Sequence, residues 1–144
     1  MKLLYLLLPS VCLLQVTGAA KDAAIKKDKD ALQGAWSVIT VASDVKDADL
    51  TKLVGAKVIF EGDKATGKVI RLGKGNECGF KLDPTVTPKT IDFVHEDGTV
   101  TPGVYLLDEN KLKICNNAPK SARPKTFESK TGSGTVLIIL RRDK

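Results

Sequence analysis

Short runs of apolar residues, separated by Gly, Pro, Asn and Asp, dominate the chain from Gly34 onward. Within most of these runs apolar and polar residues alternate, which is the period of a β-strand with one buried face. The pattern predicts strands over Ala35–Ala42, Ala56–Glu61, Ala65–Leu72, Glu77–Leu82, Thr90–His95, Val100–Leu107, Lys111–Cys115 and Thr135–Arg141. Before them, a 3.6-residue period predicts a short amphipathic helix over Asp22–Gln33. The residues on one face of this helix are Ala24, Ile25, Asp28, Ala31 and Leu32.

The predicted strands are joined mainly by turns of hairpin length. Glu61–Lys64, Glu96–Gly98 and Asp108–Asn110 supply Gly, Asp or Asn where a positive φ is needed. No helix long enough for a parallel crossover is predicted between the strands, so we expect antiparallel neighbours. Closing such a meander into a barrel removes its exposed edges. The expected fold class is therefore mostly β, an eight-stranded antiparallel up-and-down barrel with a short N-terminal helix.

Two longer connections interrupt this rhythm. Asp44–Val54 contains Asp47–Leu50 and Leu53, a spacing that predicts a helical turn. Asn116–Gly134 is the longest predicted loop, and long loops of barrel proteins often carry function. The alternative is a solvated connector that is held in place by Phe127.

One face of the predicted sheet is apolar on nearly every strand. The residues expected to point into the barrel are Trp36, Val38, Phe80, Leu82, Ile91, Phe93, Val104, Leu106, Leu112, Ile114, Val136, Ile138 and Leu140. A small barrel either fills this space with side chains or leaves a cup for one small apolar ligand. We favour a filled interior, because a surplus cavity costs stability. If a cup exists, its ligand-binding residues would be Trp36, Phe80, Phe93, Val104 and Leu106, and strand parity would place Tyr105 outside.

The first and last predicted strands are also apolar on their second face. This face carries Ile39 and Val41 on the first strand and Leu137 and Ile139 on the last. The two strands are neighbours in a closed barrel, and something must cover an apolar outer face. Either the apolar stripe of the N-terminal helix packs across them or a partner protein does.

Residues 1–20 have the three parts of a signal peptide. Lys2 is positively charged, Leu3–Val16 is a mainly apolar run, and small residues follow. Because the run is shorter than the roughly 20 apolar residues of a membrane-spanning helix, we expect cleavage after Ala19 or Ala20 and no stable membrane anchor. Acylation of Cys12 is disfavoured, because the apolar run continues past it. The expected location is periplasmic or secreted.

Residues 21–144 are too few for two domains, so we expect a single barrel domain with one core. The formal net charge of the chain is +6, and Lys and Asp alternate through Lys21–Asp30. Nucleic-acid binding would require clustered positive charge together with exposed aromatic residues. The dispersed charges therefore predict no nucleic-acid partner.

Few residues of this sequence could carry chemistry. Cys78 shares a strand face with the predicted core and Cys115 lies on the opposite face. An oxidising compartment would permit a disulfide between them, but these faces oppose it. His95 is the only histidine, and Glu96 and Asp97 beside it would suit a general base or a ligand. No nucleophile motif, phosphate-binding loop or spaced set of metal ligands accompanies it, so we expect no catalytic residue, metal, cofactor or enzyme activity.

Gly34-Ala35-Trp36 opens the first predicted strand directly after the helix. It resembles the Gly-x-Trp motif at the start of lipocalin barrels. In lipocalins a late Arg stacks on that Trp. The resemblance therefore implies structural roles for Gly34, Trp36 and Arg141, or for Arg142 beside it.

A longer series of motifs extends this resemblance over about Lys29 to Arg142. The motifs are Leu32-Gln33-Gly34-x-Trp36, Lys81-Leu82-Asp83-Pro84, Pro88-Lys89-Thr90-Ile91-Asp92, Gly103-Val104-Tyr105-x-Leu107, Leu112-Lys113-Ile114-Cys115 and Arg123-Pro124-x-x-Phe127. In this order they resemble an uncharacterised family of small secreted domains, lipocalin-like in pattern and abundant in planctomycete bacteria. Cys115 matches the pattern of that family, whereas Cys78 is peculiar to this chain. The resemblance implies fold and export, and it implies no activity, ligand or catalytic residue.

These observations together predict a non-enzymatic extracytoplasmic binding or interaction domain. A small apolar molecule is one candidate ligand. The alternative is a structural or protein-partner-binding module with a filled barrel core.

Overall fold

The computed structural model describes residues 17–43, 50–67, 77–118, 120–130 and 132–144. In chain order the elements are α1 (Gly18–Leu32), β1 (Gly34–Ser43), the 3-10 helix η1 (Leu50–Leu53), β2 (Lys57–Glu61), β3 (Lys64–Thr66), β4 (Glu77–Asp83), β5 (Thr90–Val94), β6 (Val100–Asp108), β7 (Lys111–Asn116) and β8 (Val136–Arg142). The predicted signal peptide up to residue 16, the start of the predicted helical turn and the end of the third predicted strand lie outside the described residues.

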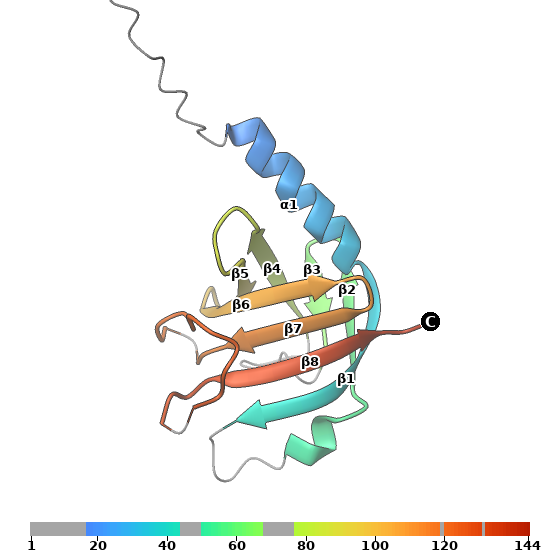
Figure 1. Cartoon of the computed structure of the whole chain (residues 1–144), viewed down its shortest axis with the longest axis vertical. Helices are drawn as coiled ribbons and strands as arrows, with labels where there is room; N and C mark the ends of the chain where they lie inside the picture. The colour runs from blue at the N-terminus through green and yellow to red at the C-terminus, as the bar shows by residue number, and fades with distance from the viewer. Residues whose placement is uncertain (1–16, 44–49, 68–76, 119, 131) are drawn as a thin grey trace, which may run out of the picture.

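The eight described strands form a closed antiparallel barrel in which each strand pairs with the next along the chain. Closure comes from pairing between β1 and β8. This confirms the predicted barrel with a short N-terminal helix. Strands β6, β7, β8 and β1 lie side by side and form one wall, and strands β2 to β5 lie behind it (Figure 1). We call the solvent-facing side of these four strands the outer wall.

A β-bulge in β1 changes which residues face the core. Val38 pairs with Leu140, but Thr40 pairs with Ile139, so Ile39 is the extra residue of the bulge and has no partner in β8. A bulge of this kind shifts the alternation of side chains beyond it. Val41 therefore packs against the core, and the prediction that it lies on the outer face is wrong.

The barrel interior is filled by one cluster of buried side chains. Its members are Leu32, Trp36, Val38, Val58, Phe60, Ala65, Cys78, Phe80, Leu82, Ile91, Phe93, Tyr105, Leu112, Ile114, Ile138 and Leu140. Phe60 and Phe80 meet edge to face, with ring centroids 5.2 Å apart. The predicted inward positions on β1, β4, β5, β7 and β8 belong to this cluster or pack against it, so the inner face of these strands was predicted correctly.

The predicted parity of β6 is wrong. Tyr105 belongs to the core cluster, whereas Leu106 is 50% exposed and Val104 is buried on the outside of the barrel. The register explains this, because Tyr105 pairs with Ile114 and Val104 pairs with Cys115. Cross-strand partners share a face, and Ile114 points inward.

Helix α1 rises from one end of the barrel and does not lie across β1 and β8 (Figure 1). It contacts β4, and Lys21 forms an ion pair with Asp83 at 3.5 Å. Leu32 and Asp28 are buried, whereas Ala31 is exposed. Of the two predicted alternatives for covering the outer face of β1 and β8, packing of the apolar stripe of this helix is therefore wrong.

Candidate functional site

The end of the barrel under helix α1 is closed by Trp36 and Arg142. The guanidinium carbon of Arg142 lies 4.3 Å from the centroid of the Trp36 ring, which is a cation–π contact. Trp36 and Arg142 are also cross-strand partners. The implied stacking therefore exists, but Arg142 makes it and the choice of Arg141 is wrong. Leu140 points inward, so the residue two positions later does so as well, and Arg141 faces solvent.

The same two side chains bind the C-terminal end of α1. The indole N–H of Trp36 donates to the carbonyl of Leu32 at 2.8 Å. Arg142 donates to the carbonyls of Gln33, at 3.0 Å, and Ala31. These bonds satisfy carbonyl groups that a helix end leaves without partners. Gly34 follows with a φ of 110°, a conformation that suits glycine, as expected for its structural role.

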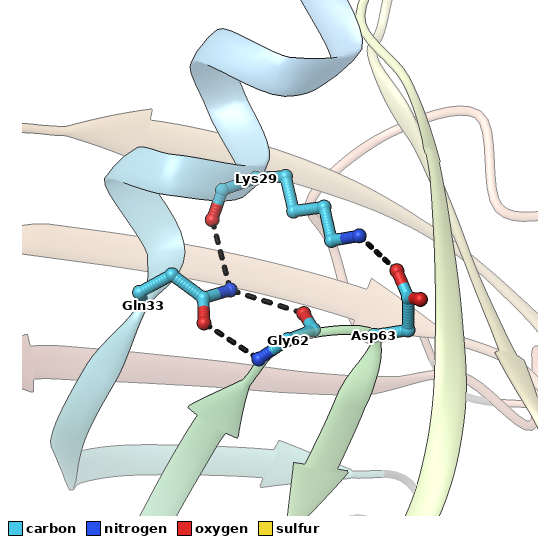
Figure 2. A network of polar contacts seen from close by, with 4 residues as sticks. All are labelled: Lys29, Gln33, Gly62 and Asp63. Carbon is cyan, nitrogen blue, oxygen red and sulfur yellow. Dashed lines mark hydrogen bonds and ion pairs between the residues drawn. The ribbon is translucent and has the colours of Figure 1, made fainter.

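A second polar network ties the helix end to the turn between β2 and β3 (Figure 2). The side-chain amide of Gln33 donates to the carbonyl of Gly62 at 3.1 Å, and its oxygen accepts from the Gly62 N–H at 2.7 Å. Lys29 forms an ion pair with Asp63 beside it. The helix is therefore anchored at this end by directional polar contacts.

A third anchor is the buried carboxylate of Asp28. One of its oxygens accepts from the Tyr105 hydroxyl at 2.6 Å and from the Lys89 ammonium at 2.9 Å. Burial, and then the Asp28 hydrogen bond, raise the pKa of the Tyr105 hydroxyl far above its usual value. Tyr105 is thus a proton-bearing donor at every physiological pH, and the cluster serves to dock the helix.

The predicted lining of a ligand cup does not come together. Trp36, Phe80 and Phe93 lie in the filled core, whereas Val104 and Leu106 are on the outside. Tyr105, which we had placed outside, takes their place in the core. On the described strands, packed side chains therefore fill the positions that would line a ligand cup.

The two cysteines and the histidine among the described residues are buried. Cys78 and Cys115 are both free and buried, and no disulfide links them. Burial raises the pKa of the Cys78 thiol to about 11 and also raises the pKa of Cys115, which makes both poor nucleophiles. His95 is buried with its Nε2 2.7 Å from the Thr101 hydroxyl. Within the described ranges no cluster of three or more metal-ligating side chains occurs.

Sequence reasoning missed a serine, a lysine and an aspartate that meet outside the barrel. Ser37 donates to one Asp143 oxygen at 2.5 Å, and Lys57 binds the other at 2.5 Å. Lys57 also lies 2.8 Å from the Ser37 hydroxyl. These residues come from β1, β2 and the segment after β8, and no local motif signals their meeting.

A shallow groove of about 640 Å³ borders the outer wall beside this cluster. Its lining consists of Ile39, the turn residues Asp108, Glu109, Asn110 and Lys111, and the segment from Arg141 to Lys144. The bulge in β1 places Ile39 here. This groove brings an apolar side chain, that of Ile39, together with several charged residues.

The outer wall continues the groove with alternating cationic and apolar side chains. Lys111 lies directly opposite Arg141, and Lys113 is paired with Leu106 on one side and Ile139 on the other. We define the wall patch as Ile39, Leu106, Lys111, Lys113, Ile139 and Arg141. Of these, Lys111 and Arg141 also line the groove, as does Ile39. The wall patch and the groove together are the candidate functional site.

Comparisons with protein-family models, with curated proteins and with solved structures find no match to this chain. Among the described residues, no helix has the length and apolarity needed to cross a membrane.

Proposed function

We propose that this chain is an exported, non-enzymatic binding domain that holds a polypeptide partner on the outside of a filled barrel. The observation that carries the proposal is the contrast between the two sides of β6, β7, β8 and β1. Their inner side is packed with side chains that are almost fully buried. Their outer side keeps apolar side chains, Leu106 above all, in contact with solvent.

The filled interior argues against a small apolar ligand. Trp36, Phe60, Phe93 and Tyr105 occupy the space that a ligand would need, and each is less than 3% exposed. Admitting a ligand would require displacing such rings, and removing even one from its packing costs several kcal/mol, about 3–5 for Phe or Trp. An outer face that carries apolar residues is instead a usual mark of protein interaction.

Titration with a fluorescent fatty acid tests the site of binding. We expect no saturable signal with the native protein and no change in Trp36 emission. The Phe93→Ala variant is the matched control, because an engineered apolar cavity accepts small apolar molecules, and its response to benzene shows that interior binding is detectable. Saturable fatty-acid binding to the native protein with a change in Trp36 emission would contradict the proposal.

Export is part of the proposal and is supported by the signal-peptide pattern. Cleavage after Ala19 or Ala20 would remove the first turn of α1 and its N-cap, Thr17. It would spare every anchor described above, since the ion pair from Lys21 is the first of them along the chain. We expect the chain recovered from periplasm or medium to have the mass of residues 20–144 or 21–144. An uncut chain in the membrane fraction would contradict export by cleavage.

A further inference from the structure

We propose that the partner segment held by the wall patch is acidic and carries apolar side chains. This inference rests on the proposed function and adds the chemistry of the partner. The outer wall carries cations without an ion pair, and apolar residues lie between them.

Three cations of the wall patch have no anion of their own. Lys111, Lys113 and Arg141 form no ion pair with any described residue. Lysines without an ion pair also occur elsewhere among the described residues, Lys27 and Lys81 for example. The wall patch differs because it brings three such cations together on two neighbouring strands.

The nearest acids do not neutralise the patch. Asp108 is the cross-strand neighbour of Lys111, and Glu109 also lines the groove, but neither carboxylate forms an ion pair with a cation of the wall patch. In the groove, Asp143 forms an ion pair with Lys57, and Arg142 donates hydrogen bonds to backbone carbonyls. The groove therefore offers Lys111 and Arg141 to an incoming anion.

The direct opposition of Lys111 and Arg141 is unfavourable for the isolated domain. Like charges at cross-strand positions destabilise a sheet, and Lys111 and Arg141 are such a pair. Lys113 is on the same face of β7, about 7 Å from Lys111 along the strand. A carboxylate of a partner placed over these three residues would remove the repulsion and gain charge-assisted hydrogen bonds.

The apolar members of the wall patch select a polypeptide over other polyanions. Leu106, Lys113 and Ile139 form one row across three strands, with apolar residues on both sides of the cation. Nucleic acid would use exposed aromatic rings for stacking, but Trp36, Tyr105 and Phe93 are buried. A second copy of this chain would bring the same positive charges face to face.

A fluorescein-labelled peptide of glutamate and leucine in alternating pairs is the probe, because this order puts both residue types on each face of an extended chain. Fluorescence anisotropy should show saturable binding that weakens as salt is added. Two control peptides replace glutamate with lysine or leucine with serine. The lysine peptide should not bind, and the serine peptide should bind several-fold more weakly.

The Arg141→Glu variant separates binding from folding. It turns the like-charged pair with Lys111 into an opposite-charge pair, so the thermal midpoint should rise by about 2 °C. The same change should lower the affinity for the acidic peptide by about tenfold or more. A second variant, Leu106→Thr, keeps a strand-forming residue at an exposed position, so the thermal midpoint should not change. It should lower the affinity for the acidic peptide several-fold.

The outcomes separate this inference from the proposed function. The inference of an acidic partner is overturned if the lysine peptide binds as tightly as the glutamate peptide. It is also overturned if the glutamate peptide binds the Arg141→Glu variant as tightly as the native protein. Binding to phosphatidylglycerol vesicles that Arg141→Glu abolishes, without binding of the peptide, overturns it in favour of a membrane surface. In the two peptide outcomes, an interior that rejects the fatty acid leaves the proposed function standing. Binding to vesicles in place of the peptide overturns the polypeptide partner of the proposed function as well. Saturable fatty-acid binding inside the barrel overturns the proposed function itself.

Discussion

Replacing Trp36 with alanine should lower the free energy of unfolding by about 3–5 kcal/mol, the usual cost of truncating a buried Trp or Phe. Trp36 is fully buried in the core cluster. Its loss would also leave the Leu32 carbonyl without its indole donor and Arg142 without the ring on which it stacks. The cavity and the loosened helix end therefore act in the same direction.

Urea denaturation followed by circular dichroism measures this loss. Trp36→Phe is the matched variant: it keeps an aromatic ring for Arg142 but cannot donate to Leu32, so it should cost less than Trp36→Ala. Ile59→Ala, at an exposed position of β2, should change stability by no more than about 0.5 kcal/mol. A loss below about 1 kcal/mol for Trp36→Ala would mean that the core and the helix end do not depend on this ring.

The barrel could be predicted from the sequence because its signals are local. Strand alternation, hairpin turns such as the one between Asp108 and Lys111, and the Gly34-Ala35-Trp36 start each require only a few neighbouring residues. Each short connection also fixes an antiparallel neighbour. The order of strands around the barrel then follows from their order along the chain, as the structure confirms.

The error in β6 could have been avoided by using turn register together with parity. In the tight turn after β6, Asp108 pairs with Lys111, and this register puts Leu107 opposite Leu112. Because Leu112 was predicted to point inward, its partner Leu107 had to do so, and with it Tyr105 two residues earlier. Apolarity alone suggested Val104 and Leu106 instead. It could not show that Val104 is buried from the outside.

Other features could not be predicted because they depend on contacts between distant segments. The bulge at Ile39 is visible only when β1 is paired with β8. The opposition of Lys111 and Arg141, on which the candidate site depends, likewise requires the register of β7 and β8. Asp28 was expected on the apolar face of the helix, but its partner Tyr105 was assigned to the wrong side of β6. The docking of the helix was predicted instead from the apolar outer faces of the first and last strands.

Replacing Asp28 with alanine should lower the free energy of unfolding by about 2–3 kcal/mol, and the effect should be concentrated in helix α1. The Asp28 carboxylate is the acceptor for Tyr105 and Lys89. Without it the Tyr105 hydroxyl, in a side chain that is 1% exposed, loses its acceptor. Lys89 is 38% exposed and can regain water, so the expected loss is below that of a fully buried ion pair.

Hydrogen–deuterium exchange distinguishes helix release from general destabilisation, because amides exchange faster where local opening becomes easier. In Asp28→Ala, exchange should accelerate in α1 at denaturant concentrations where amides of β6 to β8 remain protected. Asp28→Asn keeps an acceptor for Tyr105 and loses only the charge that faces Lys89, so its effect should be smaller. The remaining anchors hold only the C-terminal end of α1. They are the hydrogen bonds between Gln33 and Gly62 and those that Arg142 donates to carbonyls at the helix end. Unchanged exchange in α1 would show that these suffice and that the buried carboxylate does not dock the helix.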